Sequence, residues 1–214
     1  MKMYDMASRL AFFLAEQVEL EQSKIDSVRY GLEVILGEII KWIILLVLAG
    51  ILDILPGVVF SMFSSSLFRL VSGGNHCQDY WRCLALGMFV FLGGGRLAVY
   101  VAHLFSYQLL LMTILCGALF IVALVLIWAP GEVVYRKIKQ EERLVFKVLS
   151  ILFIAIWTGF TLLVINNYSI SIVLAGFLAM IIQAISFTPV GYWAIDMFDL
   201  VLSRVLGERR CSHA

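Results

Sequence analysis

The sequence predicts an all-α, polytopic membrane protein with about six transmembrane helices and an amino-terminal amphipathic helical segment. Hydrophobic residues make up 62% of the 214 residues and charged residues only 14%, against about 25% charged residues in a typical globular protein. Several apolar stretches approach the roughly 20 residues that cross a bilayer. This composition excludes a disordered chain and a typical soluble enzyme. The formal net charge of +1 also argues against nucleic acid as a partner.

The length fits one integral-membrane domain over residues 1–214, with amphipathic helices at 1–38 and a transmembrane bundle at 39–206. Two interpretations of the first segment stay open: a surface helical hairpin, or a helix that lies along the membrane interface. No secretory signal pattern is visible there, so we expect the first span to direct insertion. Apolar residues recur at helical spacing in this segment, at Leu10, Phe13, Leu14 and Val18.

Residues 39–68 are mostly apolar, with a break at Asp53 and Pro56-Gly57 that predicts two short helices joined by a turn. These helices either cross the membrane twice or form a re-entrant hairpin. The glycines at 93–95 weaken the span that follows, and Asn166-Asn167 predicts a tight turn between the last two spans. The four further spans and a short interfacial tail are expected at residues 84–105, 107–128, 148–165, 168–187 and 189–206.

Positive charges decide the expected orientation. Lys and Arg cluster before residue 42, between residues 130 and 147, and after residue 203. Loops rich in these residues stay on the cytoplasmic side, which requires an even number of crossings between each pair of clusters. Six crossings meet this requirement and place both termini, and the link at 69–82, in the cytoplasm.

The link that ends at residue 83 is the one place where His, Cys, Asp, Arg and paired glycines converge. Polar residues at the depth of a membrane are usually functional. One interpretation is a zinc site of His76, Cys77 and Cys83, but no CxxC or HxxxH spacing supplies the further ligands that zinc prefers. Another is an inert packed loop. The third is a thiolate nucleophile with a histidine base, which forms an acyl-enzyme.

The spacing of His76 and Cys83 restricts how such a pair is built. Seven residues return to nearly the same face of a helix, but they rise about 10.5 Å along its axis. Proton transfer needs a hydrogen bond of about 3 Å, so one straight helix cannot hold the dyad. Either the chain turns, as Gly73-Gly74-Asn75 permits, or the two side chains come from two subunits. Asp79 lies between them and either orients the imidazole or is an exposed polar residue.

At these residues the chain resembles the AgrB family, membrane-embedded cysteine endopeptidases of Gram-positive bacteria that process quorum-sensing pheromone precursors. The family motif is an Arg, a Gly-Gly pair, a His two residues later and a Cys seven residues after that His. Arg69, Gly73-Gly74, His76 and Cys83 match it. Residues 30–33, and the Ala-Pro pair ahead of the basic stretch, are also similar. Cys77 stands where the family has a small residue, which makes it a rival nucleophile.

The resemblance implies that Cys83 attacks a peptide bond of an AgrD-like precursor, while His76 serves as base and then as acid. The resulting thioester is resolved into a thiolactone or lactone ring. Arg136, Lys137 and Lys139 would bind the acidic tail of the precursor, although their basic character is also the ordinary cytoplasmic signal that attracts anionic lipid. The supporting residues of the dyad would be Arg69, Gly73, Gly74 and Asp79.

The resemblance further implies a multi-pass homodimer in the bacterial cell membrane, in contact with lipid, that uses no metal and no cofactor. Two other functions stay open. A small transporter of a peptide without covalent chemistry is suggested by Asp53 and Arg96 in or near spans and by a helix broken at the glycines 93–95. A membrane scaffold would instead use the charged amino-terminal 40 residues as its working surface.

Overall fold

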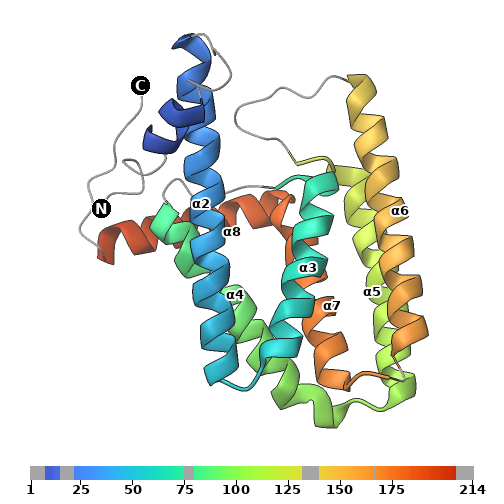
Figure 1. The fold of residues 1–214 in the computed structure, drawn as a ribbon. Coiled ribbons are helices and arrows are strands. Elements are labelled where there is room, and N and C mark those ends of the chain that lie inside the picture. The colour runs from blue at the N-terminus through green and yellow to red at the C-terminus, as the bar shows by residue number, and fades with distance from the viewer. Residues whose placement is uncertain (1–7, 15–21, 75–79, 132–139, 166, 206–214) are drawn as a thin grey trace. The chain divides into compact units, whose positions relative to one another are not determined.

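The computed structural model describes residues 8–14, 22–74, 80–131, 140–165 and 167–205 (Figure 1). The chain divides into two compact units, residues 1–48 and residues 49–214. Throughout the described residues the regular secondary structure is helix, with no strand. This confirms the predicted all-α class.

The first unit contains a helical segment at residues 8–14 and most of α2 (Gln22–Ile51). Helix α2 continues without interruption through residues 38 and 39, where the sequence predicted the change from amphipathic segment to first span. Charged side chains near this point pair along the helix, as Lys41 does with Glu38. Pairs at this spacing stabilise a helix, so the charged residues do not end it.

A turn separates α2 from α3 (Leu55–Ser72), as the break in residues 39–68 predicted. Asp53 adopts a left-handed conformation with φ 55°, which Asp tolerates better than most residues. The backbone N–H groups of Asp53 and Ile54 donate to Gly50 and Ala49. Pro56 lies in the first turn of α3, where a missing N–H costs nothing. Asp53 is exposed in this turn and does not line a span.

Helices α4 (Tyr80–Val101), α5 (Tyr107–Trp128), α6 (Gln140–Val164) and α7 (Ile170–Ser186) follow, with a short 3₁₀ helix, η1 (Ala102–Leu104), after α4. The bounds of α5 coincide with the predicted span at 107–128. The broken helix considered at the glycines 93–95 is wrong, because α4 is helical throughout. Packing accounts for one of the three glycines. A Cβ on Gly95 would lie 3.0 Å from Val58 of α3, so the small residue allows these two helices to pack closely.

The predicted tail at 189–206 is a further helix, α8 (Pro189–Val205), which is bent by 94° from α7. The bend occurs at Phe187 and Thr188. The Thr188 hydroxyl donates to the Ile185 carbonyl and accepts the N–H of Gly191 at 3.2 Å. A Cβ on Gly191 would lie 2.0 Å from the Ile185 oxygen, so only glycine fits this elbow.

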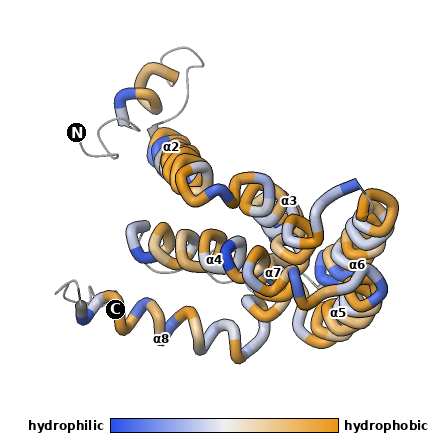
Figure 2. The backbone as a smooth tube through the Cα atoms, turned by 90° about the horizontal axis from the view of Figure 1, so that it is seen from below, coloured by the Kyte–Doolittle hydropathy of each residue, from blue (hydrophilic) through white to orange (hydrophobic). Residues whose placement is uncertain are grey.

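Helix α7 packs against α3, α4 and α5 in the second unit, while α6 packs against α3 and α5 (Figure 2). Aromatic rings fill the interface. Phe68 stacks on Phe153 with centroids 5.7 Å apart and meets the edge of Phe187 at 6.2 Å. Gly117 receives the ring of Phe177, since a Cβ on Gly117 would lie 2.1 Å from it.

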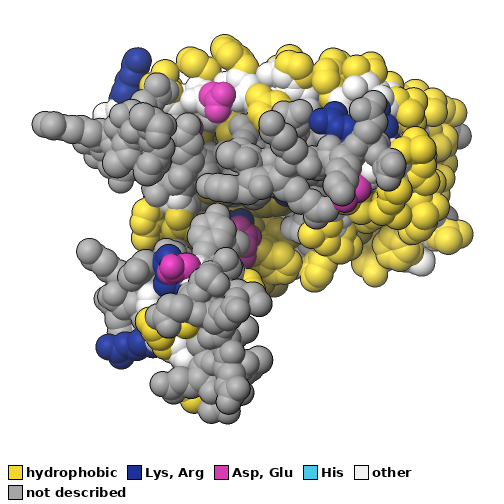
Figure 3. All heavy atoms as spheres, turned by 90° about the horizontal axis from the view of Figure 1, so that it is seen from above, with side chains coloured by type: hydrophobic (Ala, Val, Ile, Leu, Met, Phe, Trp, Pro, Cys, Tyr) yellow, Lys and Arg dark blue, Asp and Glu magenta, His cyan; other side chains and the backbone are white. Residues whose placement is uncertain are grey.

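Within the described residues, four helices are long and apolar enough to span a membrane: α3, α4 with η1, α5 and α6. The bent pair α7 and α8 makes a fifth if it counts as one broken span. Large hydrophobic side chains lie exposed on these helices, among them Phe89, Leu119 and Leu163, and hydrophobic side chains cover much of the face in Figure 3. A multi-span membrane protein accounts for this surface, but the predicted number of six crossings is not established.

Candidate active site at the end of α3 and the start of α4

The predicted site residues fall into two groups. Arg69, Gly73, Gly74 and Cys83 belong to the described chain. Helix α3 carries Arg69 in its last turn and ends at Ser72, and α4 begins at Tyr80 and carries Cys83 in its first turn. The other predicted residues lie outside the described residues: His76, Cys77 and Asp79 in the segment 75–79, and Arg136, Lys137 and Lys139 in the segment 132–139.

The Gly73-Gly74 pair ends α3 in a conformation that side chains resist. Gly73 has φ 71° and ψ −159°, and Gly74 has φ 144°. The first of these combinations is essentially restricted to glycine. The Gly73 N–H donates to the Arg69 carbonyl at 2.9 Å. A Cβ on Gly73 would lie 2.7 Å from the Gly131 oxygen, and one on Gly74 would lie 3.0 Å from Ser186 Oγ. Conformation therefore favours glycine at both positions, and the nearby Gly131 backbone also excludes a side chain at Gly73.

Gly131 brings the end of the α5 helix to this glycine turn. Its N–H donates to the Ser72 carbonyl at 2.9 Å, after the cis peptide between Ala129 and Pro130. Gly131 is buried, and a Cβ there would lie 2.9 Å from the Gly74 nitrogen. The residue that directly precedes the basic segment 132–139 thus packs against the Gly-Gly pair.

Gln183 of α7 was missed by the sequence reasoning. Its side-chain amide is buried, with 3% of the residue exposed. Nε2 donates to the Gly73 carbonyl at 2.9 Å and lies 3.4 Å from Ser72 Oγ. A signal existed, because Gln183 is the sole amide side chain within the apolar stretch 168–187, and polar groups in such a stretch need partners.

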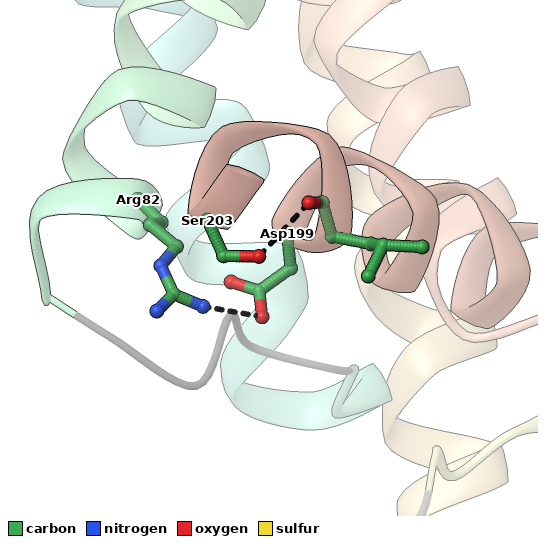
Figure 4. Close-up of polar contacts among 4 residues, drawn as sticks. Arg82, Asp199 and Ser203 are labelled. Carbon is green, nitrogen blue, oxygen red and sulfur yellow. Dashed lines mark hydrogen bonds and ion pairs between the residues drawn. The ribbon is translucent and has the colours of Figure 1, made fainter. Parts of the chain in front are cut away.

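A buried ion pair lies next to Cys83 in the sequence. Arg82 of α4 donates from Nη1 to Asp199 Oδ2 of α8 at 2.9 Å, and the two side chains are 9% and 10% exposed. Figure 4 shows the two side chains pointing toward each other from the two helices. Asp199 Oδ1 is also buried and accepts no hydrogen bond from any residue that the structure describes. Nearby on α8, Ser203 turns to its own helix and donates to the Leu200 carbonyl at 2.9 Å.

The position of Cys83 suits a nucleophile. Its side chain is half-buried on α4, in the turn that follows the segment 75–79 in the sequence. The guanidinium of the adjacent Arg82 is engaged by Asp199. No cluster of three His, Cys, Asp or Glu side chains suited to a metal occurs in the described ranges. Of the three residues considered for zinc, only Cys83 lies within those ranges.

The comparisons with known proteins agree on one family. The family model described as accessory gene regulator B matches residues 7–187, a range that includes the motif at 69–83. A Clostridium beijerinckii protein described as AgrB-like is 27% identical over 140 residues, which cover 64% of this chain and 66% of that protein. The chain thus spans just under two thirds of the length of this relative. No solved structure matches the chain. The chain belongs to the accessory gene regulator B family.

Proposed function

We propose that this protein is a membrane-embedded cysteine endopeptidase that cleaves an AgrD-like propeptide and promotes its cyclisation to an autoinducing peptide. The observation that carries the proposal is the complete motif of Arg69, Gly73-Gly74, His76 and Cys83 in a chain of this family. Two features of the structure support it. Cys83 lies in the first turn of α4, and the glycine pair occupies a conformation that other residues resist.

The proposed reaction begins when His76 takes the proton of Cys83 and the thiolate attacks the scissile carbonyl carbon. A C–S bond forms, the C–N bond breaks, and the leaving amine of the acidic tail takes a proton from His76. The product is an acyl-enzyme thioester. An internal Cys or Ser of the peptide then attacks this thioester, its proton passes to His76, and Cys83 leaves as a thiolate. Ring closure competes with hydrolysis, so a site at the membrane edge favours it by limiting water.

The acidic tail of the precursor is proposed to contact Arg136, Lys137 and Lys139. Gly131, the residue before their segment in the sequence, packs against the glycine turn of the motif. The protein is further proposed to act as a homodimer in the bacterial cell membrane, with its termini and active site facing the cytoplasm. The chemistry needs neither metal nor nucleic acid, because thiol and imidazole supply both the nucleophile and the proton transfers.

The test uses the full-length protein in membrane vesicles with a cognate AgrD-like precursor. We expect Cys83→Ala to abolish cleavage while membrane insertion is retained. Cys116→Ala is the matched control, because this thiol is exposed on α5, and Cys77→Ala is expected to remain active. Mass spectrometry of the wild type should detect the precursor fragment attached to Cys83. Continued cleavage by Cys83→Ala would refute the assignment.

The features that suggested a transporter are not found at α4 or at Asp53. These features were a helix broken at the glycines 93–95 and charges within spans. Helix α4 is unbroken there, and Asp53 lies in an exposed turn. Helix α4 therefore does not supply the discontinuous helix that typically forms a substrate site in transporters.

A further inference from the structure

The segment 75–79, which contains His76, is flanked on both sides by residues that α7 and α8 hold. On its amino-terminal side, Gln183 of α7 donates to the Gly73 carbonyl at 2.9 Å. On its carboxy-terminal side, Asp199 of α8 accepts from Arg82 at 2.9 Å. Both contacts are made by buried side chains, since Gln183 is 3% and Asp199 7% exposed. They join residues more than a hundred positions apart in the chain.

The elbow between α7 and α8 relates these two contacts to each other. The helices meet at 94°, and the Thr188 hydroxyl bridges the Ile185 carbonyl and the Gly191 N–H. The close approach of Gly191 to the Ile185 backbone leaves no room for a side chain. A tightly packed bend therefore fixes how α7, which carries Gln183, and α8, which carries Asp199, are placed relative to each other.

We propose that the α7–α8 elbow positions Cys83 and the glycine turn of the motif, with Asp199 and Gln183 as its two positioning residues. Asp199 holds Arg82 and thereby sets the direction of the first turn of α4, which carries Cys83. Gln183 holds the Gly73 carbonyl and thereby fixes the glycine turn that ends α3. Neither residue touches the substrate in this proposal. This inference rests on the proposed function, because it assigns a purpose to the geometry around that thiol.

The chemistry of the two contacts favours positioning over simple packing. An apolar pair of similar volume at a buried site is often as stable as an ion pair, or more stable. A charge-assisted hydrogen bond, in contrast, is short and directional. An amide donor aimed at one carbonyl is directional in the same way. Misplacement of a reacting group by about 1 Å can lower the rate about a hundredfold, so directional contacts at both ends of the segment matter most for turnover.

The experiment compares Asp199→Asn with Asp196→Asn, its matched control on the exposed face of α8. The full-length protein in vesicles cleaves the AgrD-like precursor, and kcat and KM are measured separately. In parallel, a small maleimide alkylates Cys83 in a background that lacks Cys77, Cys116 and Cys211. We expect Asp199→Asn to lower kcat at least about tenfold, to leave KM within about threefold and to change the alkylation rate of Cys83. Asp196→Asn should change none of these.

Conservative and isosteric variants complete the test. Asp199→Glu keeps the ion pair and should recover most of the lost kcat. Gln183→Met removes the donor with little change of volume and should lower kcat without raising KM, while Gln108→Met on the exposed face of α5 should have no effect. If Asp199→Asn does not fold, a double variant that combines Arg82→Asp with Asp199→Arg tests the positioning role instead. Restored turnover in this double variant supports positioning, and a folded but inactive double variant overturns it.

The outcomes separate this inference from the proposed function. If Cys83→Ala still cleaves the precursor, the proposed function fails, and the alkylation rates still report whether Asp199 positions the thiol. If Cys83→Ala is inactive while Asp199→Asn and Gln183→Met match their controls in kcat and in alkylation, the elbow has no positioning role and the inference alone fails.

Discussion

The Gly73→Ala variant tests the steric reasoning at the motif most directly. Gly73 has φ 71° and ψ −159°, a region that costs other residues about 1–3 kcal/mol. The new Cβ would also lie 2.7 Å from the Gly131 oxygen. Relief of this overlap displaces Gly131, whose N–H bond to Ser72 contributes about 1 kcal/mol. Together these effects predict a loss of about 2–4 kcal/mol in the free energy of unfolding.

The assay is thermal unfolding of the purified full-length protein in detergent micelles, together with precursor cleavage in vesicles. Gly93→Ala is the matched control, because Gly93 lies inside α4 and a Cβ added there would meet nothing within 4 Å. This control should stabilise α4 by about 0.5–1 kcal/mol, since Ala is the better helix former. We expect Gly73→Ala to lower the melting temperature and abolish cleavage. A melting temperature and cleavage rate equal to the wild type would refute the steric argument.

Three further variants probe other contacts. Gly191→Ala should open the α7–α8 elbow, because its Cβ would lie 2.0 Å from the Ile185 oxygen. We expect a lower melting temperature and slower cleavage of the precursor. Unchanged cleavage would contradict this. Trp157→Phe removes the 2.8 Å hydrogen bond to buried Ser64 Oγ and should lower the free energy of unfolding by about 1–3 kcal/mol, measured by unfolding in detergent. A variant as stable as the wild type within the measurement error would contradict this. Replacing Arg136, Lys137 and Lys139 by Gln should raise KM for the precursor more at low salt than at high salt. An unchanged KM at both salt concentrations would mean that these cations only attract lipid or set the membrane topology.

The helices could be predicted from local pattern to a large extent. The unbroken apolar run at 107–128 became α5 with the same bounds, because a long apolar stretch has few alternatives to a helix in lipid. Asp53 and Pro56 marked the turn before α3 for equally local reasons, a tolerated left-handed residue and a ring suited to the first helical turn. The glycines at 93–95 suggested a broken helix, but α4 is continuous there, and the role of Gly95 depends on Val58, which packs against it from another helix.

The contacts around the motif were beyond reach of any local pattern. Arg82 and Asp199 are separated by 117 positions, and Gln183 and Gly73 by 110. Gln183 stood out in an apolar stretch, so the sequence indicated that it needs a partner. Which partner it finds depends on how α7 and α8 fold back on the ends of α3 and α4.

Composition and residue order alone were enough to establish a helical membrane protein and to point to the Arg69 to Cys83 motif of its family. Hydropathy and the rule that lipid-exposed backbone must bond within its own segment act locally, so they can be read along a single chain. The elbow at Thr188, and the buried partners that it brings to Gly73 and Arg82, came only from the folded arrangement. The reason is physical: a buried polar group demands a partner, but packing of distant helices selects which one.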